Sequence, residues 1–85
     1  MYYVRSVKIV ALRGLLRDRT IKEITDRELA NSFIVPKNRG DVISIVGDDG
    51  KHYDLMMSFV KYDYDVNWHD RREGAVEIIV YCKKL

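Results

Sequence analysis

The chain has 85 residues, of which 47% are hydrophobic and 33% are charged. This length suits one domain over residues 1–85, and the composition excludes a disordered or low-complexity segment. Fifteen Lys and Arg residues against thirteen Asp and Glu residues give a formal net charge of +2. That charge is too small to indicate, by itself, a protein that binds nucleic acid.

The first segment, residues 2–12, is rich in β-branched and aromatic residues and predicts a strand. Every second residue from Val7 to Ala11 is apolar, so we expect that face of the strand to be buried. Val4 has the opposite phase. This predicts a β-bulge or a change of face near Arg5.

Residues 15–24 fit either a strand or the start of a helix. The S/T-x-x-E motif of a capping box occurs twice, beginning at Thr20 and at Thr25. We favour the second box, because a helix from about Asp26 to Phe33 then collects its apolar residues on one face. Those residues are Leu29, Ala30 and Phe33.

The next unit predicts a β-hairpin. Residues 42–46 form an apolar strand, and residues 47–50 contain an Asp-Gly pair that supplies the positive φ of a tight turn. Residues 51–62 return as a longer strand. In this strand we expect the odd-numbered residues 53–59 on one face and the even-numbered residues 52–60 on the other.

The last predicted strand covers residues 75–82 and ends at the only cysteine, Cys82. We expect this cysteine to be a buried apolar residue, because no neighbour would lower the pKa of its thiol. The lack of a disulfide fits a reducing compartment. No apolar run reaches the roughly 18 residues of a membrane span, and no signal peptide is visible, so we expect a cytoplasmic protein of a cell or an infected host.

These elements predict a small, β-rich α+β domain with four to five mostly antiparallel strands and one short helix. We expect so small a sheet to curl into an open barrel or to pack its helix on one face. The run Gly40–Ile45 before the hairpin is similar to the strands of SH3-like and related small barrels, which implies a fold and no activity. An exposed strand edge would favour a homodimer or a partner contact.

The sequence carries no catalytic or metal-binding motif. His52 and His69 lack the spacing of metal ligands, and no glycine-rich phosphate loop is present. We therefore expect a protein that is not an enzyme and that needs no metal and no cofactor.

The charge is distributed unevenly along the chain. Residues 1–27 contain seven basic and three acidic residues and carry +4, so residues 28–85 carry −2. A basic cluster in the first part suggests an alternative function, a small β-barrel that binds nucleic acid. We favour a solvated hairpin with local ion pairs, because the cluster lacks interleaved aromatic residues. The candidate nucleic-acid-binding residues are Arg13, Arg17, Arg19 and Lys22.

The segment 62–72 predicts a loop that contacts another protein. It combines two tyrosines, the only tryptophan and an arginine pair, which are the residue types enriched at interface hot spots. Its three aspartates would repel phosphates and suit a basic protein partner. Trp68 either caps the core or is exposed for binding, and the sequence leaves both open. The candidate protein-binding residues are Tyr62, Tyr64, Trp68, Arg71 and Arg72.

The function that fits best is a small protein-interaction module that inhibits or modulates a larger protein by occluding it. Such lone domains without catalytic residues are common among virus- and phage-encoded proteins, which is an analogy of size and composition.

Overall fold

A computed structural model describes residues 2–12, 18–66 and 74–85. These residues form one sheet of five strands and one short helix, which confirms the predicted β-rich α+β domain. In chain order the elements are β1 (Tyr2–Ala11), β2 (Arg19–Ile24), α1 (Arg27–Ser32), β3 (Val42–Val46), β4 (His52–Val66) and β5 (Gly74–Lys84).

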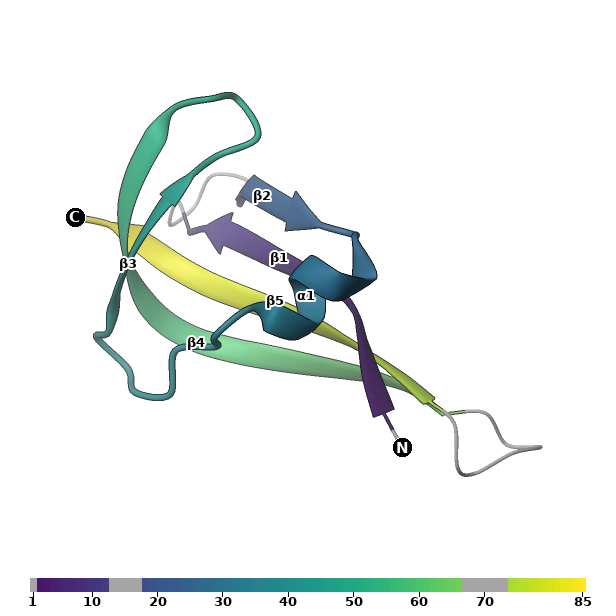
Figure 1. Ribbon diagram of the computed structural model, residues 1–85. Coiled ribbons are helices and arrows are strands. Elements are labelled where there is room, and N and C mark those ends of the chain that lie inside the picture. Colours follow the sequence, from purple (N-terminus) through teal and green to yellow (C-terminus); the bar gives the residue numbers. More distant parts are fainter. Residues whose placement is uncertain (1, 13–17, 67–73) are drawn as a thin grey trace.

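The strands lie in the order β2-β1-β5-β4-β3, and the sheet curls into a half-barrel (Figure 1). All neighbouring strands are antiparallel except β1 and β5, which run parallel. The mostly antiparallel sheet is therefore as predicted. α1 lies over the concave face, where it packs against β1 and β2.

The concave face of the sheet holds the hydrophobic core. Val7 and Ile9 of β1, Leu55 of β4, and Val80 and Cys82 of β5 are fully buried there. These positions recur every two residues along each strand, as the predicted alternation of β1 requires. Burial raises the pKa of the Cys82 thiol to about 11, so the thiol stays protonated and unreactive at neutral pH.

β1 contains a bulge at Arg5, where its register against β5 shifts just after Val4. This confirms the change of face predicted there. β2 pairs with β1 only from Val7 onward. The part of the β1 edge that precedes Val7 lies beside α1 instead. The Asn31 side chain of α1 covers it by accepting a hydrogen bond from the Val4 N–H at 3.1 Å and donating to the Val4 carbonyl at 3.3 Å.

We expect Asn31→Ala to lower the free energy of unfolding by about 1 kcal/mol, because both hydrogen bonds to Val4 are lost. Urea unfolding measures the loss, and amide hydrogen exchange at Val4 should become faster. Ser32→Ala is the matched control, because the Ser32 hydroxyl bonds only within α1, to the Glu28 carbonyl. Unchanged exchange at Val4 in Asn31→Ala would contradict this role.

Residues 19–24 form β2, so the strand alternative is correct there, but the helix begins one residue later than the favoured capping box requires. Asp26, not Thr25, is the N-cap, and its carboxylate accepts from the Leu29 N–H at 3.1 Å. Ala30 is buried whereas Leu29 is 64% exposed, so the predicted apolar face is wrong at Leu29. Neighbouring residues differ by about 100° around a helix, so the orientation that buries Ala30 against the sheet leaves Leu29 in solvent.

β4 carries a bulge that the sequence did not indicate. Its register against β5 shifts between Met57 and Phe59, so an extra residue of β4 is inserted there. Odd-numbered residues face the core up to Met57, as predicted, and the faces then exchange. Phe59 lies opposite Tyr81 on the convex face, and Val60 lies opposite Val80 on the concave face. The predicted alternation is therefore wrong at Phe59 and Val60, because Val60, not Phe59, shares the face of Met57.

The predicted turn between β3 and β4 closes one end of the half-barrel against β2. The Asp48 N–H donates to the Ile21 carbonyl at 2.9 Å, and the Asp48 carboxylate accepts from the Glu23 N–H at 3.0 Å. Gly50 has a φ of 80°, as predicted for the Asp-Gly pair. The sheet is thus tied together at this end, while β4 and β5 extend beyond α1 at the other end (Figure 1).

Candidate functional site

The first part of the segment predicted as an aromatic loop is a strand. Tyr62 lies in β4, as the predicted strand over residues 51–62 requires, and β4 continues through Tyr64, so the loop prediction is wrong at the described residues 62–66. The reason is pairing with β5: Tyr62 lies opposite Ile78 and Tyr64 lies opposite Val76, and this apolar strand holds the polar segment extended. The other members of the predicted set lie outside the described residues: Trp68, Arg71 and Arg72.

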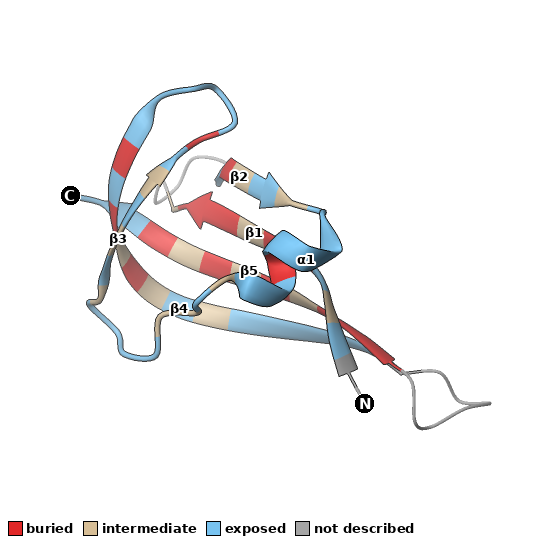
Figure 2. Ribbon diagram, viewed as in Figure 1, coloured by how far each residue is buried: buried red, intermediate tan, exposed pale blue. Residues whose placement is uncertain are grey.

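Tyr62 and Tyr64 lie on the concave side of the sheet and are 49% and 56% exposed. Their rings are 6.5 Å apart between centroids and nearly parallel. Figure 2 shows the second half of β4 exposed beside the largely buried β5. Rigid, exposed aromatic rings with polar hydroxyl groups are typical of interaction surfaces.

The edge of β4 that faces away from β5 is paired over only part of its length. β3 pairs with it as far as Met56. Met57 then donates its N–H to the Asp41 carbonyl at 2.8 Å and accepts from the Gly40 N–H at 2.9 Å. From Ser58 onward, no strand in the described part of the chain pairs with this edge.

In a strand, the face of a side chain fixes the edge toward which that residue's N–H and C=O point, because both repeat every two residues. Met57 on the concave face points toward β3, whereas Asp54 on the convex face accepts from the Leu85 N–H on the β5 side. After the bulge, Val60 and Tyr62 occupy the concave face. Their backbone groups therefore point toward the open edge, hereafter the β4 edge (residues 58–65).

A groove of about 540 Å³ lies at the start of the β4 edge. One wall consists of residues 34–37 and Arg39, and the other consists of residues 57–60 and Tyr62. Ile34, on the first wall, is 87% exposed. Sequence reasoning missed this groove, because its walls come from distant segments and depend on the bulge. The apolar run that follows α1 was the one available signal.

On the convex face, the β4 edge begins with an aromatic side chain and continues with charged ones. Phe59 stacks on Tyr81 with ring centroids 4.5 Å apart, and it is still 52% exposed. Lys61 and Asp63 follow on the same face, and both are exposed. The open edge therefore has Tyr62 and Tyr64 on its concave side, and one basic and two acidic side chains follow Phe59 on its convex side. The second acidic residue, Asp65, lies 3.4 Å from Arg5 Nη1 of the same chain.

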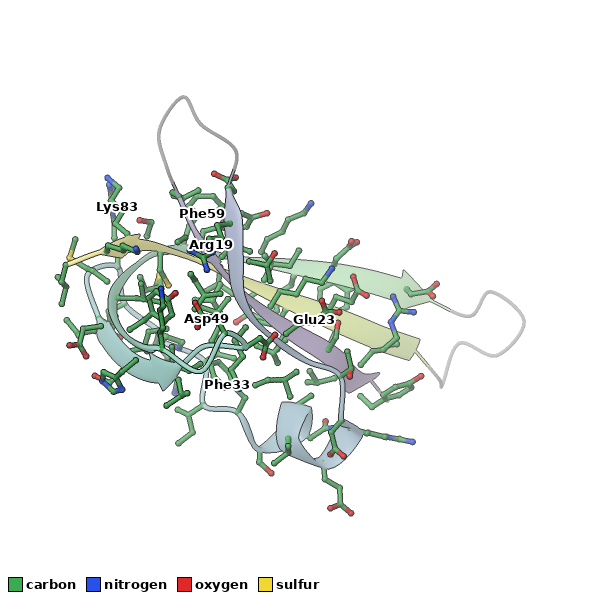
Figure 3. All side chains as sticks on the ribbon, turned by 90° about the horizontal axis from the view of Figure 1, so that it is seen from above. Arg19, Glu23, Phe33, Asp49, Phe59 and Lys83 are labelled. Atoms are coloured by element: carbon green, nitrogen blue, oxygen red, sulfur yellow. The ribbon has the colours of Figure 1, made fainter. Side chains whose placement is uncertain are left out.

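Two of the residues predicted for the nucleic-acid alternative are in local ion pairs. Arg19 Nη2 lies 3.0 Å from Asp49 Oδ2, and Figure 3 labels both residues. Lys22 Nζ lies 3.7 Å from Asp48 Oδ1. Both acidic partners belong to the β3–β4 turn, so these pairs help to hold the turn against β2, although exposed pairs contribute little each. The other two residues lie outside the described residues: Arg13 and Arg17.

Asp49 makes the turn sensitive to acid. The pKa of Asp49 lies below its ordinary value, first because the Tyr53 hydroxyl donates to it and second because the Lys51 N–H does. A carboxyl whose pKa is lowered by folding stabilises the native state above its unfolded pKa, and this contribution is lost as the pH falls through the folded value.

We therefore expect the melting temperature to fall as the pH drops below about 4. Asp49→Asn should be less stable at pH 7 and should lose less on acidification than the original chain. Thermal unfolding at a series of pH values measures this difference. Equal acid sensitivity of the two proteins would contradict the role of Asp49.

The β3–β4 hairpin carries a polar cluster on its convex side. His52 Nε2 lies 3.4 Å from Asp54 Oδ1, and the Ser44 hydroxyl donates to the same carboxylate at 2.6 Å. The Ser44 hydrogen bond is the main reason that the pKa of Asp54 lies below its ordinary value. Within residues 2–12, 18–66 and 74–85, no group of three or more His, Cys, Asp or Glu residues could hold a metal ion.

No helix in the described ranges is long and apolar enough to cross a membrane. Comparison with known proteins adds no relative: no family model, no curated protein and no solved structure matches the chain.

Proposed function

We propose that this protein is a non-enzymatic interaction module that binds an extended segment of a protein along the β4 edge. The observation that carries the proposal is a run of edge-facing backbone groups, at Val60 and Tyr62, flanked by exposed aromatic rings. Such an edge can accept a further strand, whose main-chain hydrogen bonds contribute affinity.

The side chains around the edge would select the bound segment. Tyr62 and Tyr64 offer apolar area with hydroxyl groups, and the neighbouring groove offers Ile34 and Val60 to an apolar side chain. Binding at the edge would cover the contacted surface of the partner. The module would thereby inhibit or modulate a larger protein by occlusion.

Affinity capture with edge variants tests the proposal. Tyr62→Pro removes the N–H that points to the open edge and leaves the β4–β5 ladder intact, because residue 62 points away from β5. Val42→Pro is the matched control at the edge of β3. Tyr62→Ala separates the loss of the ring from the loss of the N–H.

A protein that is captured by the original chain and by Val42→Pro, and at least about tenfold less by Tyr62→Pro, supports the proposal. Direct titration with that purified protein then gives the affinity ratio. Equal capture by Tyr62→Pro, in a variant whose melting temperature shows that it is folded, would exclude the β4 edge as the binding surface.

A further inference from the structure

We propose that a second copy of this chain occupies the β4 edge in the free protein, pairing antiparallel about a two-fold axis at Tyr62. The inference deepens the proposed function, since it names an occupant of the same edge. The edge forms a continuous sheet with its copy, and a partner strand would have to displace that copy.

The backbone geometry fits a two-fold axis at Tyr62. Such an axis places each residue of β4 opposite a residue of the second copy's β4. The two residues lie equally many positions from Tyr62, on opposite sides of it in the sequence. Tyr62 then faces Tyr62 of the second copy. Because its backbone points to the open edge, the two tyrosines exchange N–H···O=C bonds in both directions. Val60 points the same way and continues the ladder.

Charge selects this register over its neighbours. With the axis at Tyr62, Lys61 lies opposite Asp63 of the second copy, and the symmetry forms this pair twice. An axis at Lys61 or at Asp63 sets a charge against itself. An axis at Tyr64 sets Asp63 against Asp65 of the second copy. An axis at Val60 brings Asp63 opposite Met57, whose backbone is already paired with residues 40–41.

The groove fits the same register. Tyr64 of the second copy arrives opposite Val60, beside the exposed Ile34. An aromatic ring placed there covers apolar surface that the single chain leaves open to water. The groove therefore offers an apolar contact at the position that this backbone register reaches.

The outer edge of β3, one of the two terminal strands of the sheet, fits a second copy less well. The turn that follows β3 is tied to β2 through the Asp48 N–H and the Ile21 carbonyl. β3 itself, residues 42–46, contains no charged residue, so nothing in it distinguishes one register from another. Its five residues also make a short edge, which is one way in which sheets limit such pairing.

Charge reversal tests both the partner and the register. We expect the full chain to sediment as a dimer in a micromolar concentration series. Lys61→Asp and Asp63→Lys each create two like-charge pairs and should raise the dimer Kd at least about tenfold. The double variant Lys61→Asp/Asp63→Lys restores opposite charges and should restore the dimer. Lys83→Asp, an exposed strand residue outside the β4 edge, is the control for net charge.

Each outcome decides the inference. A monomeric original chain, or single variants that remain dimers, overturns it. Single variants that are monomeric without rescue in the double variant overturn the register at Tyr62. Circular dichroism verifies that each variant is folded. If the original chain is monomeric but captures a partner protein that Tyr62→Pro does not capture, the proposed function stands and only the dimer is excluded. If the double variant restores the dimer but no partner protein depends on Tyr62 for capture, the β4 edge serves self-association alone.

Discussion

Leu55→Ala should lower the free energy of unfolding by about 2–5 kcal/mol, the largest effect that we expect of any single substitution. Leu55 is fully buried on the concave face of β4 and belongs to the same hydrophobic core as the buried residues of β1 and β5. Removing its side chain leaves a cavity that a curled sheet with hydrogen bonds on both sides of β4 cannot easily fill. For a domain of this size the loss is a large part of the total stability.

Leu29→Ala is the matched control, because the chemical change is the same and Leu29 is exposed on α1. Its effect should stay within about 0.5 kcal/mol. Urea unfolding of both variants, with equal slopes, gives the two values directly. Similar losses in the two variants would contradict the assignment of the concave face as the core.

The strands that form the core could be predicted because their pattern is local. The side chains of β1 from Val7 to Ala11 and those of β4 up to Met57 alternate between the two faces of the sheet. This alternation indicates directly which of them face the core. The Asp-Gly turn is equally local, since its conformation depends on a residue without a side chain. The fold class followed from these segments and from the short helix between them.

The candidate site could be predicted only in part, because it depends on pairing. Tyr62 and Tyr64 were chosen for their residue type, but their place in a strand follows from the apolar β5 beside them. The bulge between Met57 and Phe59 contains no glycine or proline, so the sequence carries no local signal for it. Without the bulge, Val60 would point to the wrong face, and the open edge could not be located.

The parallel pair of β1 with β5 was also beyond local reasoning. The two strands come from opposite ends of the chain, and no short connection forces them together. Burial explains the result: both strands are apolar on their inner face, and the central positions of the sheet bury such strands best. The more polar β2 and the five-residue β3 are left at the edges.

Gly47→Ala should destabilise the protein by about 1–3 kcal/mol, because the site has no space for a methyl group. A Cβ atom at this position would lie 2.8 Å from Tyr53 Cε2, 2.9 Å from Asp49 Oδ1 and 3.1 Å from the Ile21 carbonyl oxygen. The side chains can shift, but the Ile21 oxygen belongs to the backbone of β2. Relief of the clash therefore requires the turn to move away from β2.

This movement separates the effect of Gly47→Ala from simple loss of backbone freedom. The Asp48 and Glu23 amides bond across the contact between the turn and β2, so their hydrogen exchange should accelerate more than that of the central strands. Gly40→Ala is the control, since Gly40 has a φ of 95° and nothing within 4 Å of its added Cβ. That variant should be strained locally and leave both amides protected. Equal acceleration across the whole sheet in Gly47→Ala would show that the turn contact does not close the half-barrel.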